Sequence, residues 1–188
     1  MKINQSILLA VLLMAGSCQS TTSSQRSVSV VGLVPMSGTS TTEYLSASTE
    51  SDLDRSGAAV RLENRDGRIG LGVEVRQSNY AKATGDSDGI ELAGFVRRYM
   101  DKSDSSLYVE ASPILGLGIS GGLNPDSSSY VLLRVAAGYR WMMSDSIFID
   151  VDTGYFMTFM EMDHGTPGVS NSEEVDGVDV GIAIGFNF

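Results

Sequence analysis

The stretch VDVGIAIGFNF, residues 178–188, alternates without a break between two kinds of side chain. Every even position from Val178 to Phe188 is apolar, and every odd position between them is small or polar. A period of two residues predicts a β-strand whose two faces meet different surroundings. The face that meets water therefore decides between a water-soluble protein and one that crosses a membrane with strands.

Further segments of the chain repeat this alternation at lengths that suit strands. The first is the least regular, because Val31 and Leu33 depart from the alternation and Pro35 interrupts backbone pairing. In the fourth, Arg98 falls on the apolar face, which a β-bulge or an arginine that reaches toward lipid head groups would explain. The eight predicted strands are residues 27–36, 57–63, 68–75, 90–100, 107–119, 131–141, 147–159 and 178–188.

The connections between these strands alternate between short and long. The tight turns are residues 64–67, 101–105 and 144–146, and the long polar loops are residues 37–56, 80–89, 120–128 and 161–175. In an up-and-down meander this order places every short turn at one end of the molecule. Short turns at one end and long loops at the other are typical of outer-membrane barrels. The sequence therefore predicts an all-β fold, an eight-stranded antiparallel up-and-down transmembrane β-barrel.

The bulk composition limits the classes of function. The chain has 188 residues, which is one domain's worth, and carries 13 Lys and Arg against 23 Asp and Glu, a formal net charge of −10. No basic patch is present to follow a phosphate backbone, so nucleic acid is excluded as a partner.

The N-terminus has the organisation of an export signal, which we assign to residues 1–17. Lys2 supplies the positive charge, residues 7–15 form the apolar run, and small residues precede Cys18. Residues 18–26 form a Ser/Thr-rich segment, and residues 27–188 form the barrel domain. Cys18 is the only cysteine, so no intramolecular disulfide forms. The segment MAGSC resembles a bacterial lipobox, although Ala15 stands where leucine is usual; acylation of Cys18 and ordinary cleavage nearby both stay open.

The composition of the two faces favours an outward apolar face. A soluble lipocalin-like barrel also has alternating strands, but its outward positions carry large solvated side chains. Here the positions opposite the apolar residues are mostly Gly, Ala and Ser with isolated charges, which suit the crowded interior of a narrow barrel. Bulky aliphatic residues suit a wall that faces lipid.

Charges of both signs share the face that carries the small residues. Isolated charges inside a barrel are costly, but paired arginines and carboxylates satisfy one another. We interpret them as a polar plug that fills the lumen and blocks conduction, with the solvated exterior of a soluble protein as the alternative. The predicted lumen network is Arg61, Glu63, Arg68, Glu74, Arg76, Glu91, Arg97, Glu110, Arg134, Arg140, Asp150, Asp152 and Asp179.

Aromatic residues gather near the predicted strand ends, where the two lipid–water interfaces would lie. The predicted aromatic rim is Tyr80, Tyr139, Trp141, Phe159, Phe186 and Phe188.

The export signal, eight amphipathic strands, alternating loops and terminal GFNF together resemble the small outer-membrane β-barrel superfamily, which includes OmpA-like and OmpX-like domains. The resemblance covers residues 27–188 and implies location in the outer membrane of a Gram-negative cell envelope. It also implies that Phe188 is an assembly signal, through which the C-terminal strand contacts the barrel-assembly machinery.

A search for chemistry finds no catalytic, cofactor-binding or metal-binding residues. His164 is the only histidine, and we interpret it as a loop residue because no strand serine adjoins it. Residues 85–89 and 124–129 resemble fragments of calcium loops but lack the ligand spacing of an EF-hand. The acidic loops suggest that divalent cations bridge them to anionic lipopolysaccharide.

The leading interpretation is a non-enzymatic barrel with a filled lumen that serves envelope structure or surface interaction. Its expected partners are membrane lipid, lipopolysaccharide and an extracellular ligand at the loops. The alternatives are a narrow OmpW-type channel for small solutes, an outer-leaflet enzyme that modifies lipid A, and a soluble lipocalin-like lipoprotein.

Overall fold

The structure is a computed structural model that describes residues 24–44, 47–82, 87–120, 128–162 and 171–188. Within these residues no helix is long and apolar enough to cross a membrane. The strands are β1 Gln25–Tyr44, β2 Ala47–Asp66, β3 Ile69–Lys82, β4 Ser87–Tyr99, β5 Ser106–Ser120, β6 Ser128–Met142, β7 Ile147–Met162 and β8 Asn171–Asn187.

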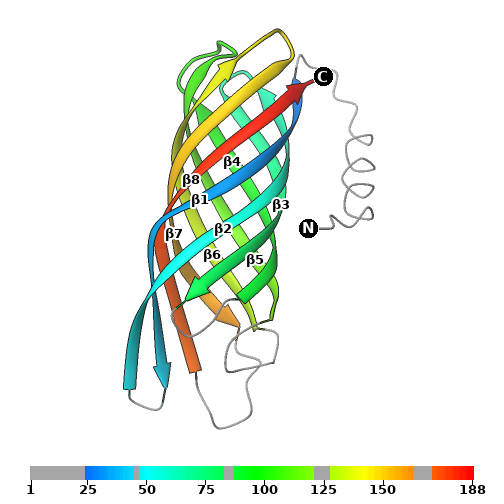
Figure 1. Cartoon of the computed structure of the whole chain (residues 1–188). Helices are drawn as coiled ribbons and strands as arrows, with labels where there is room; N and C mark the ends of the chain where they lie inside the picture. Colours follow the sequence, from blue (N-terminus) through cyan, green and yellow to red (C-terminus); the bar gives the residue numbers. More distant parts are fainter. Residues whose placement is uncertain (1–23, 45–46, 83–86, 121–127, 163–170) are drawn as a thin grey trace.

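These strands form one closed antiparallel barrel in chain order, in which β1 pairs with both β2 and β8 (Figure 1). Closure joins Ser27 to Asn187 and Tyr44 to Asn171 at the two ends of the seam. The short connections lie at one end of the barrel, beside the C-terminus, at the top of Figure 1. The predicted fold class is confirmed.

The apolar faces point away from the barrel, as predicted. The exposed fraction is 62% for Val30, 58% for Leu107 and 62% for Ile184, whereas the charged residues of the opposite face are buried. A soluble barrel would reverse this arrangement. The wall is therefore the surface that meets hydrocarbon, and the small and charged residues fill the interior.

Two of the predicted loops are wrong over most of their length. Residues 37–56 belong mainly to strands, because β1 continues to Tyr44 and β2 starts at Ala47, with Thr39 paired to Asp52. Residues 80–89 are likewise strand wherever the structure describes them, because β3 continues to Lys82 and β4 begins at Ser87. Within the predicted loop 161–175, β8 begins already at Asn171. Beyond the apolar wall the outward residues of β2 are polar, as at Asp52 and Asp54, so the apolar alternation disappears while the backbone ladder continues.

The irregular first strand keeps its place in the barrel through a local shift. Val31 and Leu33 point inward and are buried, while Val30 and Val34 are exposed on the wall. The register with β8 shifts between Pro35 and Ser37, next to the residue that has no N–H to donate.

Arg98 needs no such shift. It is exposed, and its pairs with Ile69 and Val109 continue the regular register of β4. Of the two explanations offered for this residue, the bulge is therefore wrong, and the arginine projects from the outer wall.

Inward glycines make room for large side chains from neighbouring strands. A Cβ added at Gly72 would lie 2.3 Å from the Phe95 ring, and one added at Gly185 would lie 2.1 Å from the Phe148 ring. Real Cβ atoms do not approach so closely, so glycine is required where these rings cross the lumen. The small residues seen in the sequence thus mark contact sites in a crowded interior.

Candidate functional site

The barrel interior is a buried network of charges, contributed by β2 to β8. Twelve of the thirteen predicted lumen residues are buried there, and Arg55 and Arg65 join them. In the described part of the chain the buried charged residues are seven arginines, Arg55, Arg61, Arg65, Arg76, Arg97, Arg134 and Arg140, and seven acids, Glu63, Glu74, Glu91, Glu110, Asp150, Asp152 and Asp179.

Eight of these side chains form a closed ring in which the sign of the charge alternates. Arg55 contacts Glu91 at 2.5 Å and Asp179 at 3.0 Å, which joins β2 to β4 and to β8. Arg134 closes the far side, at 2.6 Å from Asp179 and 3.4 Å from Glu110. The complete order is Arg55, Glu91, Arg76, Glu74, Arg61, Glu110, Arg134, Asp179 and back to Arg55.

A second ring of four residues lies nearer the short turns. Asp150 contacts Arg97 and Arg140 at 2.7 Å each, and Glu63 contacts Arg140 at 2.7 Å and Arg97 at 3.4 Å. Arg97 also lies 2.7 Å from Glu110 of the larger ring. The two rings therefore form one network, in which every arginine has at least two carboxylate partners.

Tyrosine hydroxyls complete the coordination of the carboxylates. Tyr80 and Tyr130 donate to Glu91 at 2.5 and 2.8 Å, and Tyr99 donates to Glu63 at 2.7 Å. Because carboxylates accept several hydrogen bonds, these donors offset part of the cost of burying their charge.

Arg65 seals the short-turn end of the lumen differently. Its guanidinium group donates to the carbonyl oxygens of Gly67, Asp101 and Ser103 at 3.0, 3.3 and 2.8 Å, and stacks 3.8 Å from the centre of the Tyr99 ring. One arginine thus ties two short turns together across the opening.

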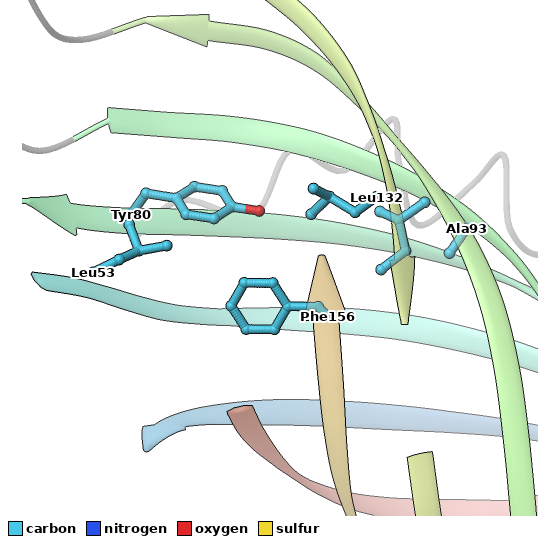
Figure 2. Close-up of a cluster of buried hydrophobic side chains, with 6 residues drawn as sticks. Leu53, Tyr80, Ala93, Leu132 and Phe156 are labelled. Carbon is cyan, nitrogen blue, oxygen red and sulfur yellow. The ribbon is translucent and has the colours of Figure 1, made fainter. Parts of the chain in front are cut away.

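An apolar cluster packs against the larger ring inside the barrel. Figure 2 shows Leu53, Tyr80, Ala93, Leu132 and Phe156 directed toward one another from five strands, and Ile114 belongs to the same cluster. The Arg55 guanidinium lies 4.9 Å from the centre of the Phe156 ring. Charged and apolar side chains together fill this part of the lumen.

Two predicted site residues lie elsewhere, and the structure corrects them. Arg68 is exposed, because β3 begins only at Ile69 and the alternation does not extend into the turn. Tyr80 is buried at 3% exposure and contacts the network, so it does not belong to the aromatic rim.

The remaining rim residues are on the outer wall where their side chains are described. Trp141, Phe186 and Phe188 are 53%, 47% and 58% exposed, and Tyr139 is half-buried with its ring 4.7 Å from that of Trp141. The side chain of Phe159 lies outside the described residues, as do Cys18, His164 and the predicted signal peptide.

Sequence reasoning missed Arg55 and Arg65 for separate reasons. Arg55 stood in a predicted loop, and Arg65 in a predicted turn. Both have the odd numbering of the inward residues Arg61 and Glu63 on the same strand, which is the signal that a longer β2 would have made visible.

The turn after β4 carries an acid whose surroundings favour its charge. The hydroxyl and backbone N–H of Ser103 both donate to the Asp101 carboxylate, and these hydrogen bonds lower the pKa of Asp101 below its ordinary value. The hydrogen bonds within this exposed turn therefore favour the charged form of the Asp101 carboxylate.

Comparisons with known proteins agree with this architecture. No protein-family model and no curated protein matches the chain, but solved structures do. The crystal structure of Neisserial surface protein A (NspA) aligns with a TM-score of 0.53 and 12% identity, over 88% of this chain and 99% of that one. The solid-state NMR structure of outer membrane protein AlkL in DMPC lipid bilayers aligns with a TM-score of 0.62 and 11% identity, over 92% and 94%.

Ail, the attachment invasion locus protein of Yersinia pestis, aligns with a TM-score of 0.48 and 14% identity, over 87% of this chain and 98% of that one. The fold shared with NspA and AlkL and the apolar outer wall agree with the expected location in the outer membrane. The chain has the fold of the small eight-stranded outer-membrane β-barrels.

Proposed function

We propose that this protein is a non-enzymatic outer-membrane barrel whose closed lumen gives it a structural or surface-interaction role. The observation that carries the proposal is the continuous ion-pair network across the interior. Ions or solutes could pass only after several pairs had separated, and each separation leaves a buried charge without a partner. Such a loss costs about 3–5 kcal/mol for a buried pair.

The exposed surface then offers the means of interaction. Acidic side chains are exposed at the long-loop end of the barrel, in keeping with cation-bridged contacts to lipopolysaccharide or to an extracellular ligand. The described members of this group are Glu50, Asp52, Asp54, Asp88 and Glu174. Removal of divalent cations by chelation should weaken association with lipopolysaccharide, and unchanged association would contradict the bridge.

Conductance in planar bilayers tests the closed lumen. The purified protein should give no stable current steps, and Arg134→Ala should introduce them because it removes three ion pairs. Arg98→Ala is the matched control, since that arginine is exposed on the wall. Stable steps in the unmodified protein that change with Arg134→Ala would support the narrow-channel alternative instead.

The enzyme alternative has its own test. Mass spectrometry of lipid A should show the same species with and without overexpression of the protein, and with the His164→Ala variant. New lipid A species that depend on His164 would overturn the non-enzymatic assignment.

A further inference from the structure

The apolar wall differs in height around the barrel. On β6 six successive outward residues are apolar, Trp141, Tyr139, Ala137, Val135, Leu133 and Val131, and on β8 six more run from Phe188 to Val178. On β3 four are apolar, Ile69, Leu71, Val73 and Val75, and on β2 three, Leu62, Val60 and Ala58.

Polar residues occupy the positions where the wall of β2 and β3 stops short. Gln77 and Asn79 are exposed on β3 where β6 has Leu133 and Val131, and Ser56 follows Ala58 on β2. Gln77 and Leu133 are each the fifth outward residue from the short-turn end of their strands, so they are at comparable heights. We define Ser56, Gln77 and Asn79 as the polar patch.

The difference is large compared with the thickness of a bilayer. Each outward residue adds about 5 Å of barrel height, because two residues advance about 6.6 Å along a strand tilted by about 40°. Six residues span five such steps and match the apolar band of about 25 Å that outer-membrane barrels carry, whereas four residues span three steps, about 15 Å, and fall short of the band by about 10 Å. A tilt of the barrel in the bilayer would move the apolar stretches on both sides, but it would not lengthen the short stretch of β2 and β3.

A bilayer of uniform thickness would place the polar patch in hydrocarbon. Side-chain amides and hydroxyls there would lose their hydrogen bonds to water, which is costly. A short apolar stretch is accommodated when the bilayer thins beside it, at a modest cost for each ångström. The polar patch is uncharged and lies at the long-loop end of the barrel. Lipid head groups that move down along it can therefore form hydrogen bonds with its amide and hydroxyl groups.

We propose that β2 and β3 thin the outer leaflet locally, with lipid head groups in contact with the polar patch. The occupant of this surface is the head-group layer of the bilayer. A second copy of the chain over the patch is the competing occupant, and the experiment separates the two.

Spin-label accessibility tests the proposal in the full chain carrying Cys18→Ser. Gln77→Cys and Leu133→Cys are labelled with a nitroxide and reconstituted into dimyristoylphosphatidylcholine vesicles. The ratio of oxygen to nickel-chelate accessibility should be several-fold lower at position 77, because polar reagents reach it. Val73 and Ala137 are each the third outward residue of their strands. Labels at both positions should be accessible mainly to oxygen and give equally high ratios of oxygen to nickel-chelate accessibility.

Each other result overturns the proposal. Equal ratios at positions 77 and 133 would mean that the bilayer has one thickness around the barrel. Low accessibility of position 77 to both reagents, with dipolar broadening between labels, would mean that a second copy covers the patch. If Gln77→Cys does not fold, Asn79→Cys and Val131→Cys, the sixth outward residues, form an equivalent pair.

Discussion

Gly72 on β3 lies on the inner face of the barrel, whereas Gly94 on β4 lies on the outer face. The space around the two glycines differs for that reason. An alanine Cβ at Gly72 would lie 2.2 Å from the Leu62 carbonyl oxygen and 2.3 Å from the Phe95 ring, whereas nothing lies within 4 Å of one at Gly94. We expect Gly72→Ala to lower the free energy of unfolding by about 1–3 kcal/mol. Urea titration in detergent micelles, followed by Trp141 fluorescence, measures the change.

The control for that experiment is Gly94→Ala, which should stay within about 0.5 kcal/mol of the unmodified protein. If both substitutions cost the same, the inward glycines are not required by packing.

Arg134, on β6, belongs to the larger ring and contacts three carboxylates, those of Glu110, Asp152 and Asp179. Arg134→Ala should lower the free energy of unfolding by about 3–5 kcal/mol, because buried carboxylates lose their counter-charge. Urea titration again measures the change, with Arg98→Ala expected to cost no more than about 1 kcal/mol. If Arg134→Ala lowers the free energy of unfolding by less than Arg98→Ala does, the ion-pair network contributes little to stability.

At this scale the sequence allowed most of the lumen charges to be predicted. Residue parity assigns Glu74 and Arg76 to the inner face once the strand is known. Parity gave the wrong face for Arg68, which lies in the turn before β3 begins, and it was not applied to Arg65, because that residue stood in a predicted turn. It also says nothing of partners: the pairing of Arg55 with Asp179 joins residues 124 positions apart and depends on how the barrel closes.

Among the strands, β8 is the one whose end carries the expected assembly signal. Phe188 is 58% exposed, and its backbone N–H donates to the Arg26 carbonyl at 2.9 Å. Phe188→Ala keeps that backbone bond and removes the ring. We expect lower yields of folded protein in the outer membrane of cells and unchanged spontaneous folding into detergent, because only the first route uses the assembly machinery.

Fractionation of cells followed by gel mobility measures the yield, and Phe186→Ala is the matched control. An equal decrease for both substitutions, or a defect in detergent as well, would assign Phe188 to packing in place of recognition.

The strands themselves were predictable only where they cross the apolar layer. Their existence and order follow from alternation, as in residues 178–188. Their full lengths do not, since Thr39 to Tyr44 and Ala47 to Asp52 pair as strands although their sequence shows no apolar alternation. A periodicity in hydropathy reports the medium around a strand, and its loss at a membrane boundary does not mark the end of backbone pairing.

For the whole molecule, closure predicts resistance to detergent. A barrel in which every strand has two neighbours has no open edge within the membrane-spanning region from which unfolding can begin. We expect the unheated protein to migrate differently from the boiled protein in dodecyl sulfate gels, and circular dichroism of the unheated form to show β-structure. Identical mobility with and without heating, together with a coil spectrum, would contradict the fold.

The seam between β1 and β8 also sets the order of events in biogenesis. Ser27 pairs with Asn187, so the first strand made waits for the last before its backbone is satisfied on both sides. Contacts so distant in sequence form slowly. Until the seam closes, the apolar outward residues belong to hairpins that are only partly paired, and such surfaces are prone to aggregate.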